Sequence, residues 1–235
     1  MIAQRVGAVR ERIARAATRA GRPREEITLV AVSKTHPPER VREAFAAGVR
    51  DFGENKVQEA EAKVAALADL KPAGLRWHLV GHLQANKARK AAALFDRIHS
   101  LDDAGLGLRL EKASAQLKKT LPLLVQVDLA REDTKFGLDE ERLFPALELL
   151  RGLKSVRVEG LMAMPPYEED PERSRPYFRR LRELRDRARQ ENLLLGAELS
   201  MGMSHDLEVA IEEGATLVRV GTAIFGERGQ GAAER

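Results

Sequence analysis

Residues 27–60 read ITLVAVSKTHPPERVREAFAAGVRDFGENKVQEA, and this stretch decides the fold. Its apolar run at 28–32 predicts a strand. Two prolines then open a helix over 38–47, because a proline in the first helical turn gives up no hydrogen bond. Gly48 stands where a left-handed residue ends such a helix, and a second predicted strand follows at 49–52. A strand, a helix and a further strand in this order predict two parallel neighbours in one sheet.

The same alternation continues along the rest of the chain. Eight predicted strands within 235 residues favour one closed (β/α)8 barrel preceded by an extra N-terminal helix. A doubly wound open sheet is the alternative. We expect this single domain to cover residues 1–228, with a flexible tail at 229–235. The predicted strands are 28–32, 49–52, 76–80, 97–99, 123–127, 157–159, 197–199 and 217–219, and the predicted helices are 3–20, 38–47, 57–70, 86–93, 102–117, 139–151, 171–190 and 205–213.

The composition narrows the functional classes. Hydrophobic residues make up 43% and charged residues 32% of the chain, as in globular rather than disordered proteins. There is no cysteine, which excludes disulfide scaffolds, thiolate metal sites and cysteine nucleophiles, and we expect no metal site. The formal net charge is only +4, and the basic stretch 173–189 mixes arginine with acids at helical spacing. An ion-paired helix face is therefore favoured over nucleic-acid binding.

No apolar run approaches the roughly 20 residues that cross a bilayer. Residues 1–15 also lack the apolar core of a secretion signal. We therefore expect a cytoplasmic protein without a membrane partner. No long exposed apolar stripe stands out, so a monomer is expected.

Lys34 is the sharpest chemical signal, because it stands at the end of the first predicted strand. In a barrel of this kind the active site lies at the C-terminal ends of the strands. A lysine that is partly buried in such a place has a lowered pKa, since burial disfavours the ammonium form. The neutral amine can attack the carbon of an aldehyde or ketone. The alternative is a lysine that simply extends into solvent.

The ends of the last two strands carry a second signal. Gly221 and Thr222 follow the eighth strand, where barrels frequently bind phosphate through backbone N–H groups and hydroxyls. Ser200 and Gly202, after the seventh strand, would form the other wall. Arg219 precedes Gly221 by two residues, so both face the same side of the strand. The alternative for this arginine is an ion pair inside the barrel.

Other candidates are weaker. Asn55 can orient a ligand or satisfy loop backbone, and Met201 can border a flat ligand or fill the core. His78 and His82 bracket a strand end without a further carboxylate or thiolate, which disfavours a metal site. A reactive lysine opposite a phosphate site is typical of proteins that bind pyridoxal 5′-phosphate and of barrel aldolases that cleave sugar phosphates. The residues alone leave both classes open.

Six spaced motifs run in order along nearly the whole chain. They are AVSKTH at 31–36, FGENKVQE at 52–59, WHLVGHLQANK at 77–87, GLMAM at 160–164, LSMGMS at 199–204 and VRVGTAIFG at 218–226. Together they resemble the pyridoxal phosphate homeostasis protein family. The resemblance implies the barrel of the alanine racemase N-terminal domain, which is the fold-type III architecture of proteins that bind pyridoxal phosphate (PLP).

The resemblance also implies roles for single residues. Lys34 would hold PLP as an internal aldimine, and Ser200, Gly221 and Thr222 would surround the phosphate. Arg219 would face a phosphate oxygen or the ring nitrogen, and at the nitrogen it would make the ring a weaker electron sink. The cofactor-binding residues that we expect are Lys34, Asn55, Ser200, Met201, Gly202, Arg219, Gly221 and Thr222.

These implications favour a binding protein over an enzyme. The chain would buffer PLP or deliver it to apo-enzymes that depend on it, as part of vitamin B6 homeostasis. Racemases of this fold use a tyrosine from a second domain, and we expect that domain and its acid–base group to be absent here. The alternative is a weak racemase that uses Lys34 as its only base.

Overall fold

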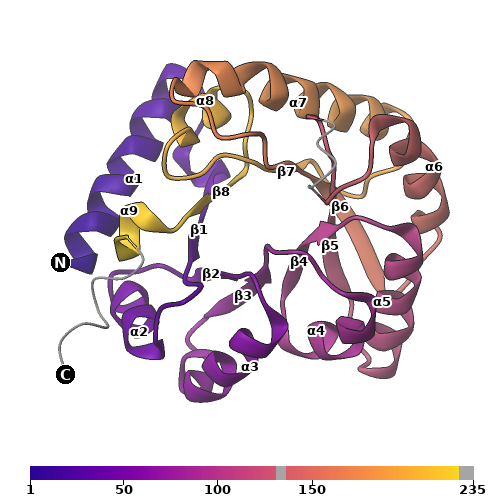
Figure 1. Ribbon diagram of the computed structural model, residues 1–235, viewed down its shortest axis with the longest axis horizontal. Helices are drawn as coiled ribbons and strands as arrows, with labels where there is room; N and C mark the ends of the chain where they lie inside the picture. Colours follow the sequence, from indigo (N-terminus) through magenta and orange to yellow (C-terminus); the bar gives the residue numbers. More distant parts are fainter. Residues whose placement is uncertain (131–135, 228–235) are drawn as a thin grey trace.

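The computed structural model describes residues 1–130 and 136–227, and its centre is a closed barrel of eight parallel strands (Figure 1). The strands follow one another around the barrel in chain order, and the last pairs with the first. This confirms the predicted (β/α)8 barrel over the open sheet. The predicted tail at 229–235 lies outside the described residues. The strands are β1 (Thr28–Val32), β2 (Asp51–Glu54), β3 (Arg76–Leu79), β4 (Arg97–Leu101), β5 (Leu121–Gln126), β6 (Val156–Met162), β7 (Glu198–Ser200) and β8 (Leu217–Val220).

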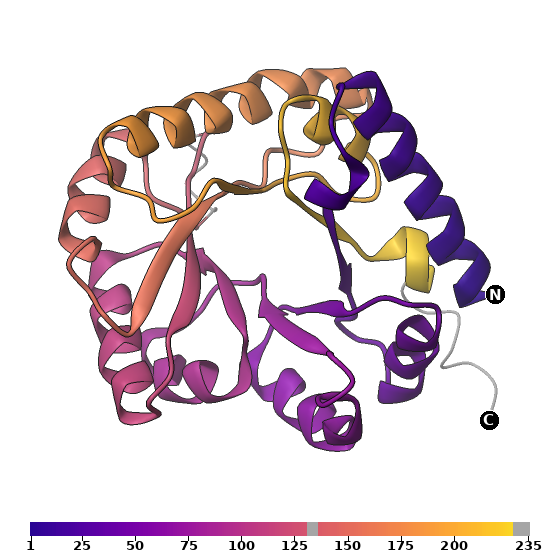
Figure 2. The same cartoon turned by 180° about the vertical axis from the view of Figure 1, so that it is seen from behind.

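Helices surround the barrel, and the predicted extra helix at the N-terminus packs outside it against α8 and α9 (Figures 1 and 2). That first helix buries Ile2, Val6, Val9 and Ile13, whose spacing of three or four residues places them on one face. The helices are α1 (Ile2–Arg19), α2 (Pro38–Ala46), α3 (Val57–Ala66), α4 (Ala88–Leu94), α5 (Ala104–Gln116), α6 (Glu140–Leu150), α7 (Arg175–Gln190), α8 (Leu207–Glu212) and α9 (Thr222–Phe225).

Element boundaries differ from the prediction where backbone caps decide them. β2 begins at Asp51 rather than at residue 49, because the Val49 amide still bonds to the carbonyl of Ala44 and closes α2. Gly48 has φ +89° at this cap, as predicted. The predicted helix over 171–190 divides into a 3-10 turn (Pro171–Ser174) and α7, which opens with a proline in its first turn.

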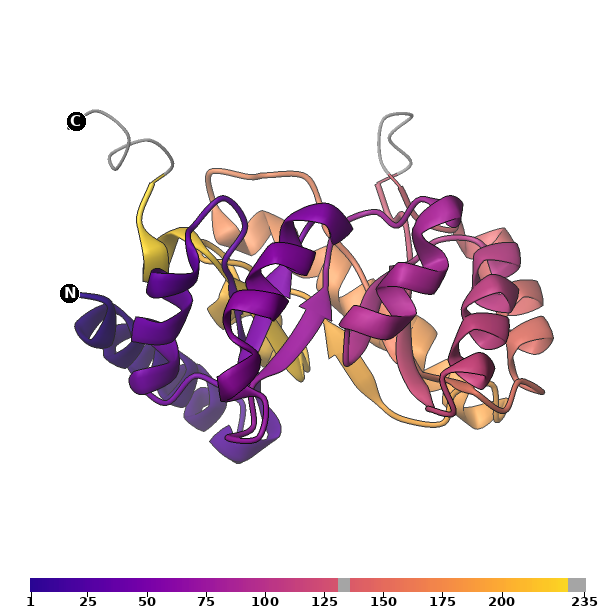
Figure 3. The ribbon, with the colours of Figure 1, turned by 90° about the horizontal axis from the view of Figure 1, so that it is seen from below.

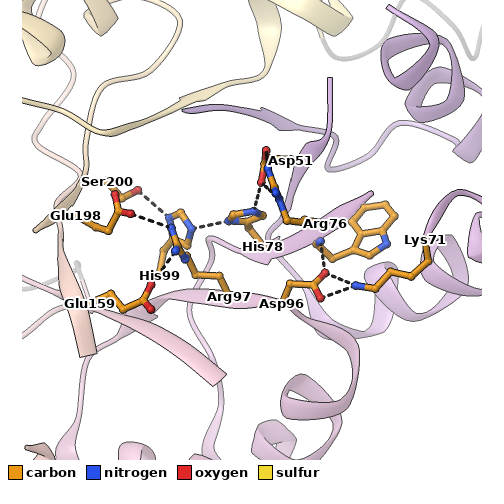
Figure 4. Close-up of polar contacts among 11 residues, drawn as sticks. Asp51, Lys71, Arg76, His78, Asp96, Arg97, His99, Glu159, Glu198 and Ser200 are labelled. Carbon is orange, nitrogen blue, oxygen red and sulfur yellow. Dashed lines mark hydrogen bonds and ion pairs between the residues drawn. The ribbon is translucent and has the colours of Figure 1, made fainter. Parts of the chain in front are cut away.

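The interior of the barrel is unusually polar. Its apolar part is a small cluster of Val30, Leu124, Met162 and Leu217, separate from the main core between strands and helices. Barrels of this class are typically filled by branched apolar side chains. Here a layer of buried polar groups lies among the strands instead (Figure 4). Because these groups are shielded from water, they must form hydrogen bonds with one another or with the backbone. The layer contains Asp51, His78, His99, Ser200 and Arg219.

The outer surface agrees with the charge pattern of the sequence. Arg175 of α7 pairs with Glu212, and Arg180 pairs with Glu140 on the neighbouring helix α6. The basic stretch is therefore laced with ion pairs, as its helical spacing predicts. Among the helices that the structure describes, none is both long and apolar enough to cross a membrane. Seen from the side, the connection from β6 to α7 arches over one end of the barrel (Figure 3).

Candidate functional site

A cavity of about 400 Å³ lies at the C-terminal ends of the strands. Lys34 follows the end of β1 by two residues, Asn55 follows β2 directly, and Arg219 lies within β8. Because parallel strands end on the same face of a barrel, these three side chains meet in one cavity together with Gly221 and Thr222. Five of the eight residues expected from the sequence therefore line it.

The other three expected residues form the wall behind the cavity. Ser200 and Met201 are fully buried and do not line it. Gly202 has φ +87°, and a Cβ added there would lie 2.5 Å from the Cβ of Ala210, so only glycine fits without strain. Its carbonyl accepts the backbone N–H of Arg219 at 2.9 Å. These residues thus hold β8 against the end of β7.

Arg219 brings a buried positive charge to the cavity. Its side chain is almost wholly enclosed, with 4% of the residue exposed. Nη1 donates to the hydroxyl of Ser200 at 2.6 Å, and Nη2 donates to the carbonyl of Ala163 at 3.0 Å. Burial lowers the pKa of Arg219 to about 10, with Asp206 acting against the shift, so the guanidinium stays protonated at neutral pH. Its hydrogen bonds in the described part of the chain go to neutral groups.

The residues on either side of Lys34 are held by buried polar groups. The hydroxyl of Ser33 donates to Oε1 of Glu54 at 2.6 Å. The ammonium of Lys63 donates to the same oxygen and to the carbonyl of Ser33, each at 2.7 Å. Burial raises the pKa of Glu54, although the hydrogen bonds from Lys63 and Ser33 act in the opposite direction. The start of the loop that carries Lys34 is therefore fixed.

Thr35 fixes the other side of that loop. Its backbone N–H donates to Oε1 of Glu59 at 2.5 Å, and its φ is +66°. A left-handed conformation is rare for a β-branched residue, so the surrounding contacts must enforce it. Lys63 also bonds to Glu59, at 2.8 Å, and so links both sides of Lys34.

The sequence did not single out His36, Tyr167 or Ser204, which also line the cavity. His36 and Ser204 stand in the runs just after β1 and β7, so their position was the available signal. Tyr167 arrives on the long connection from β6 to α7 and is 74% exposed, and no local pattern marks it. Burial, aided by the charges of Arg40 and Lys63, lowers the pKa of His36.

Comparison with known proteins adds the family. Residues 5–229 match the model of the alanine racemase N-terminal domain. A pyridoxal phosphate homeostasis protein of Aquifex aeolicus is 46% identical over 225 residues, which cover 96% of this chain and 97% of that protein. The chain belongs to the pyridoxal phosphate homeostasis protein family. The family resemblance found in the sequence motifs is thereby confirmed.

Other members of the pyridoxal phosphate homeostasis protein family are similar over the whole length. The protein of Escherichia coli K12 is 40% identical, with 97% of each chain covered. Among solved structures, PipY of Synechococcus elongatus with PLP bound has a TM-score of 0.85 and 41% identity, and the match covers 96% of this chain and all of that one. An alanine racemase of Clostridium difficile has a TM-score of 0.72 at 13% identity, with 57% of its chain covered, and shares the fold alone.

Proposed function

We propose that this chain binds PLP reversibly at Lys34 and serves PLP homeostasis by holding the cofactor rather than by turning over a substrate. One observation carries the proposal. A single cavity is lined by a lysine at a strand end, a buried arginine, and the glycine and threonine that follow β8. Its volume of about 400 Å³ falls in the usual range for small-molecule sites, roughly 300–1,000 Å³.

The lining groups fit the chemistry of the cofactor. PLP supplies an aldehyde, which condenses with a neutral lysine amine as a C=N bond forms and water leaves. Lys34 is the lysine in the cavity that can provide this amine. Thr222 and the backbone at Gly221 are neutral hydrogen-bonding groups suited to phosphate oxygens. The guanidinium of Arg219 can only donate hydrogen bonds, so it suits a hydrogen-bond acceptor of PLP, either a phosphate oxygen or the ring nitrogen.

Arg219 also bears on the choice between holding PLP and catalysis. A guanidinium that donates to the pyridine nitrogen leaves this nitrogen unprotonated, which weakens the ring as an electron sink. Most reactions that depend on PLP need that sink. Relatives are named for homeostasis, and PipY has been solved with PLP bound, which supports a holding role. Delivery to apo-enzymes, a monomeric state and residence in the cytoplasm are further parts of the proposal.

Absorbance spectroscopy tests the proposal directly. The wild-type protein with PLP should show a yellow band that borohydride abolishes, and peptide mapping should find the reduced label on Lys34. Lys34→Ala should remove the band. The matched control is Lys56→Ala, because Lys56 lines a neighbouring cavity rather than this one. A colourless wild-type protein, or a label spread over several lysines, would refute the assignment.

Two further measurements separate holding, delivery and catalysis. The loaded protein is mixed with an apo-enzyme that requires PLP, in the presence of a phosphatase that destroys free PLP. Activation that survives the phosphatase means direct delivery, whereas its loss means release into solution. Solvent deuterium that enters the α-position of an amino acid, dependent on Lys34, would favour the weak racemase instead.

A further inference from the structure

A line of polar side chains crosses the barrel interior, starting at the cavity, and Figure 4 shows its part from Ser200 through His99 and His78 to Asp51. It begins at Arg219, whose Nη1 lies 2.6 Å from the hydroxyl of Ser200. That hydroxyl lies 2.8 Å from Nδ1 of His99, and Nε2 of His99 lies 2.9 Å from Nδ1 of His78. Nε2 of His78 lies 2.9 Å from Oδ1 of Asp51. Strands β8, β7, β4, β3 and β2 each supply one member.

The two ends of the line favour one direction for the hydrogen bonds between them. Arg219 can only donate, and an ionised Asp51 can only accept. Asp51 is kept ionised because Arg76 donates to both of its oxygens, each at 2.7 Å. Burial alone would raise the pKa of Asp51, but hydrogen bonds from His78 and Arg76 hold it well below its usual range.

With these ends, one hydrogen-bond order serves every group while both imidazoles are neutral. In this order Nε2–H of His78 donates to Asp51, and Nδ1 of His78 accepts from Nε2–H of His99. The Ser200 hydroxyl then donates a hydrogen bond to Nδ1 of His99, and its oxygen accepts a hydrogen bond from Arg219. Burial holds the pKa of His99 well below its ordinary value; a positive charge on His78 would lower it further, as the charges of Arg219 and Arg97 do.

Burial makes the line sensitive to any missing member. The five residues are at most 6% exposed, and each ring nitrogen already has its partner within the line. A buried polar group that loses its partner carries the full cost of its desolvation. Substitution at one place therefore disturbs the neighbouring bonds, including those near the cavity.

We propose that His99, His78 and Asp51 are positioning residues of the cofactor site, which keep the Ser200 hydroxyl as an acceptor for Arg219 and so aim its guanidinium into the cavity. Neither histidine nor Asp51 lines the cavity. The positioning role rests on the proposed function, whereas the hydrogen-bond order does not.

The hydrogen-bond order is tested on the cofactor-free wild-type protein. Nitrogen-15 NMR of the imidazoles distinguishes the two neutral tautomers and the imidazolium. At neutral pH, His99 and His78 should both carry the proton on Nε2. A proton on Nδ1 of His99, or a charged His99, would reverse the order and overturn the proposal.

The positioning role is tested by PLP titration of variants. His99→Leu removes the acceptor of the Ser200 proton and should weaken PLP binding by about tenfold or more, with a shifted absorbance maximum. His99→Asn places an amide oxygen near the former Nδ1 and should restore most of the affinity. Asp51→Asn changes only the far end and should act in the same direction as His99→Leu.

His82→Leu is the matched control, because His82 is a histidine outside the line that borders the neighbouring cavity. Thermal unfolding of each variant confirms that it is folded before titration. Wild-type affinity and spectrum in folded His99→Leu and Asp51→Asn would overturn the positioning role. A wild-type protein that takes up no PLP would overturn the proposed function and the positioning role together, whereas the tautomer measurement would still decide the hydrogen-bond order.

Discussion

The ammonium of Lys63 lies 2.7 Å from Oε1 of Glu54, and both side chains are buried. This pair holds the start of the loop that carries Lys34. A buried ion pair costs desolvation on both sides, but removal of one partner leaves the other charge alone in the interior.

Lys63→Met should therefore lower the free energy of unfolding by about 3 kcal/mol. The double variant with Glu54→Gln should recover part of this loss, because the stranded charge is gone. Urea denaturation measures both. Lys90→Met is the control, because its pair with Glu61 is largely exposed and should contribute less than about 1 kcal/mol. Equal losses at residues 63 and 90 would contradict the prediction.

Acid should destabilise the protein through His99. The ring titrates near its ordinary value of 6.5 in the unfolded chain, whereas burial keeps it neutral in the native state. Below that pH the unfolded chain binds one more proton, so stability falls as pH falls, by up to about 1.4 kcal/mol per pH unit. His99→Asn should flatten the slope between pH 7.5 and 5 in urea denaturation. Equal slopes of unfolding free energy against pH in wild type and variant would exclude His99 as the cause of the acid destabilisation.

Removal of the cation in the cavity should weaken the cofactor complex. Arg219→Met deletes a buried donor and should reduce PLP affinity by about tenfold or more in absorbance titrations. Arg219→Lys keeps the charge but loses the planar fork, so an intermediate affinity is expected. Arg187→Met on α7 is the control, because its ion pair with Glu191 is exposed. Unchanged binding in Arg219→Met would remove the residue from the site.

The wall behind the cavity should not tolerate a larger residue at Gly202. Its φ of +87° and the approach of Ala210 make Gly202→Ala strained, at a cost of about 2 kcal/mol. Thermal and urea unfolding should show the loss. Gly7→Ala in α1 meets no atom within 4 Å and should instead stabilise the protein by up to about 1 kcal/mol. A neutral Gly202→Ala would mean that the β7–α8 connection adjusts freely.

Local patterns were sufficient to predict the order of strands and helices. The proline pair at the start of α2 and the left-handed Gly48 after its end act within a few residues, and the structure contains both signals as predicted. Local position was also sufficient for Lys34 and Arg219. They line the cavity because the C-terminal ends of all the parallel strands lie on the same face of the barrel. The sequence pattern left the doubly wound sheet as an alternative. Closure of the barrel depends on the pairing of β1 with β8, which no short stretch of sequence encodes.

Hydrogen bonds between residues far apart in the chain could not be predicted from the sequence pattern. The spacing of His78 and His82 argued only against a metal site and said nothing of His99, which bonds to a residue 101 positions later in the chain. A period of two places His78 and His99 inside the barrel but does not pair them. The burial of Ser200 behind Arg219, rather than at the cavity surface, likewise depends on the packing of β7 against β8.

β8 pairs with β1, with Thr28 opposite Leu217 and Val30 opposite Arg219. This pairing also means that the cavity is completed only at the end of synthesis. Ribosomes deliver Lys34 early and Arg219 late, and the two share a cavity only after the final strand has emerged and docked. A nascent chain therefore has no finished pocket to offer a reactive aldehyde. If the proposed function holds, loading with PLP follows synthesis, and a product that ends before β8 should lack the assembled cavity.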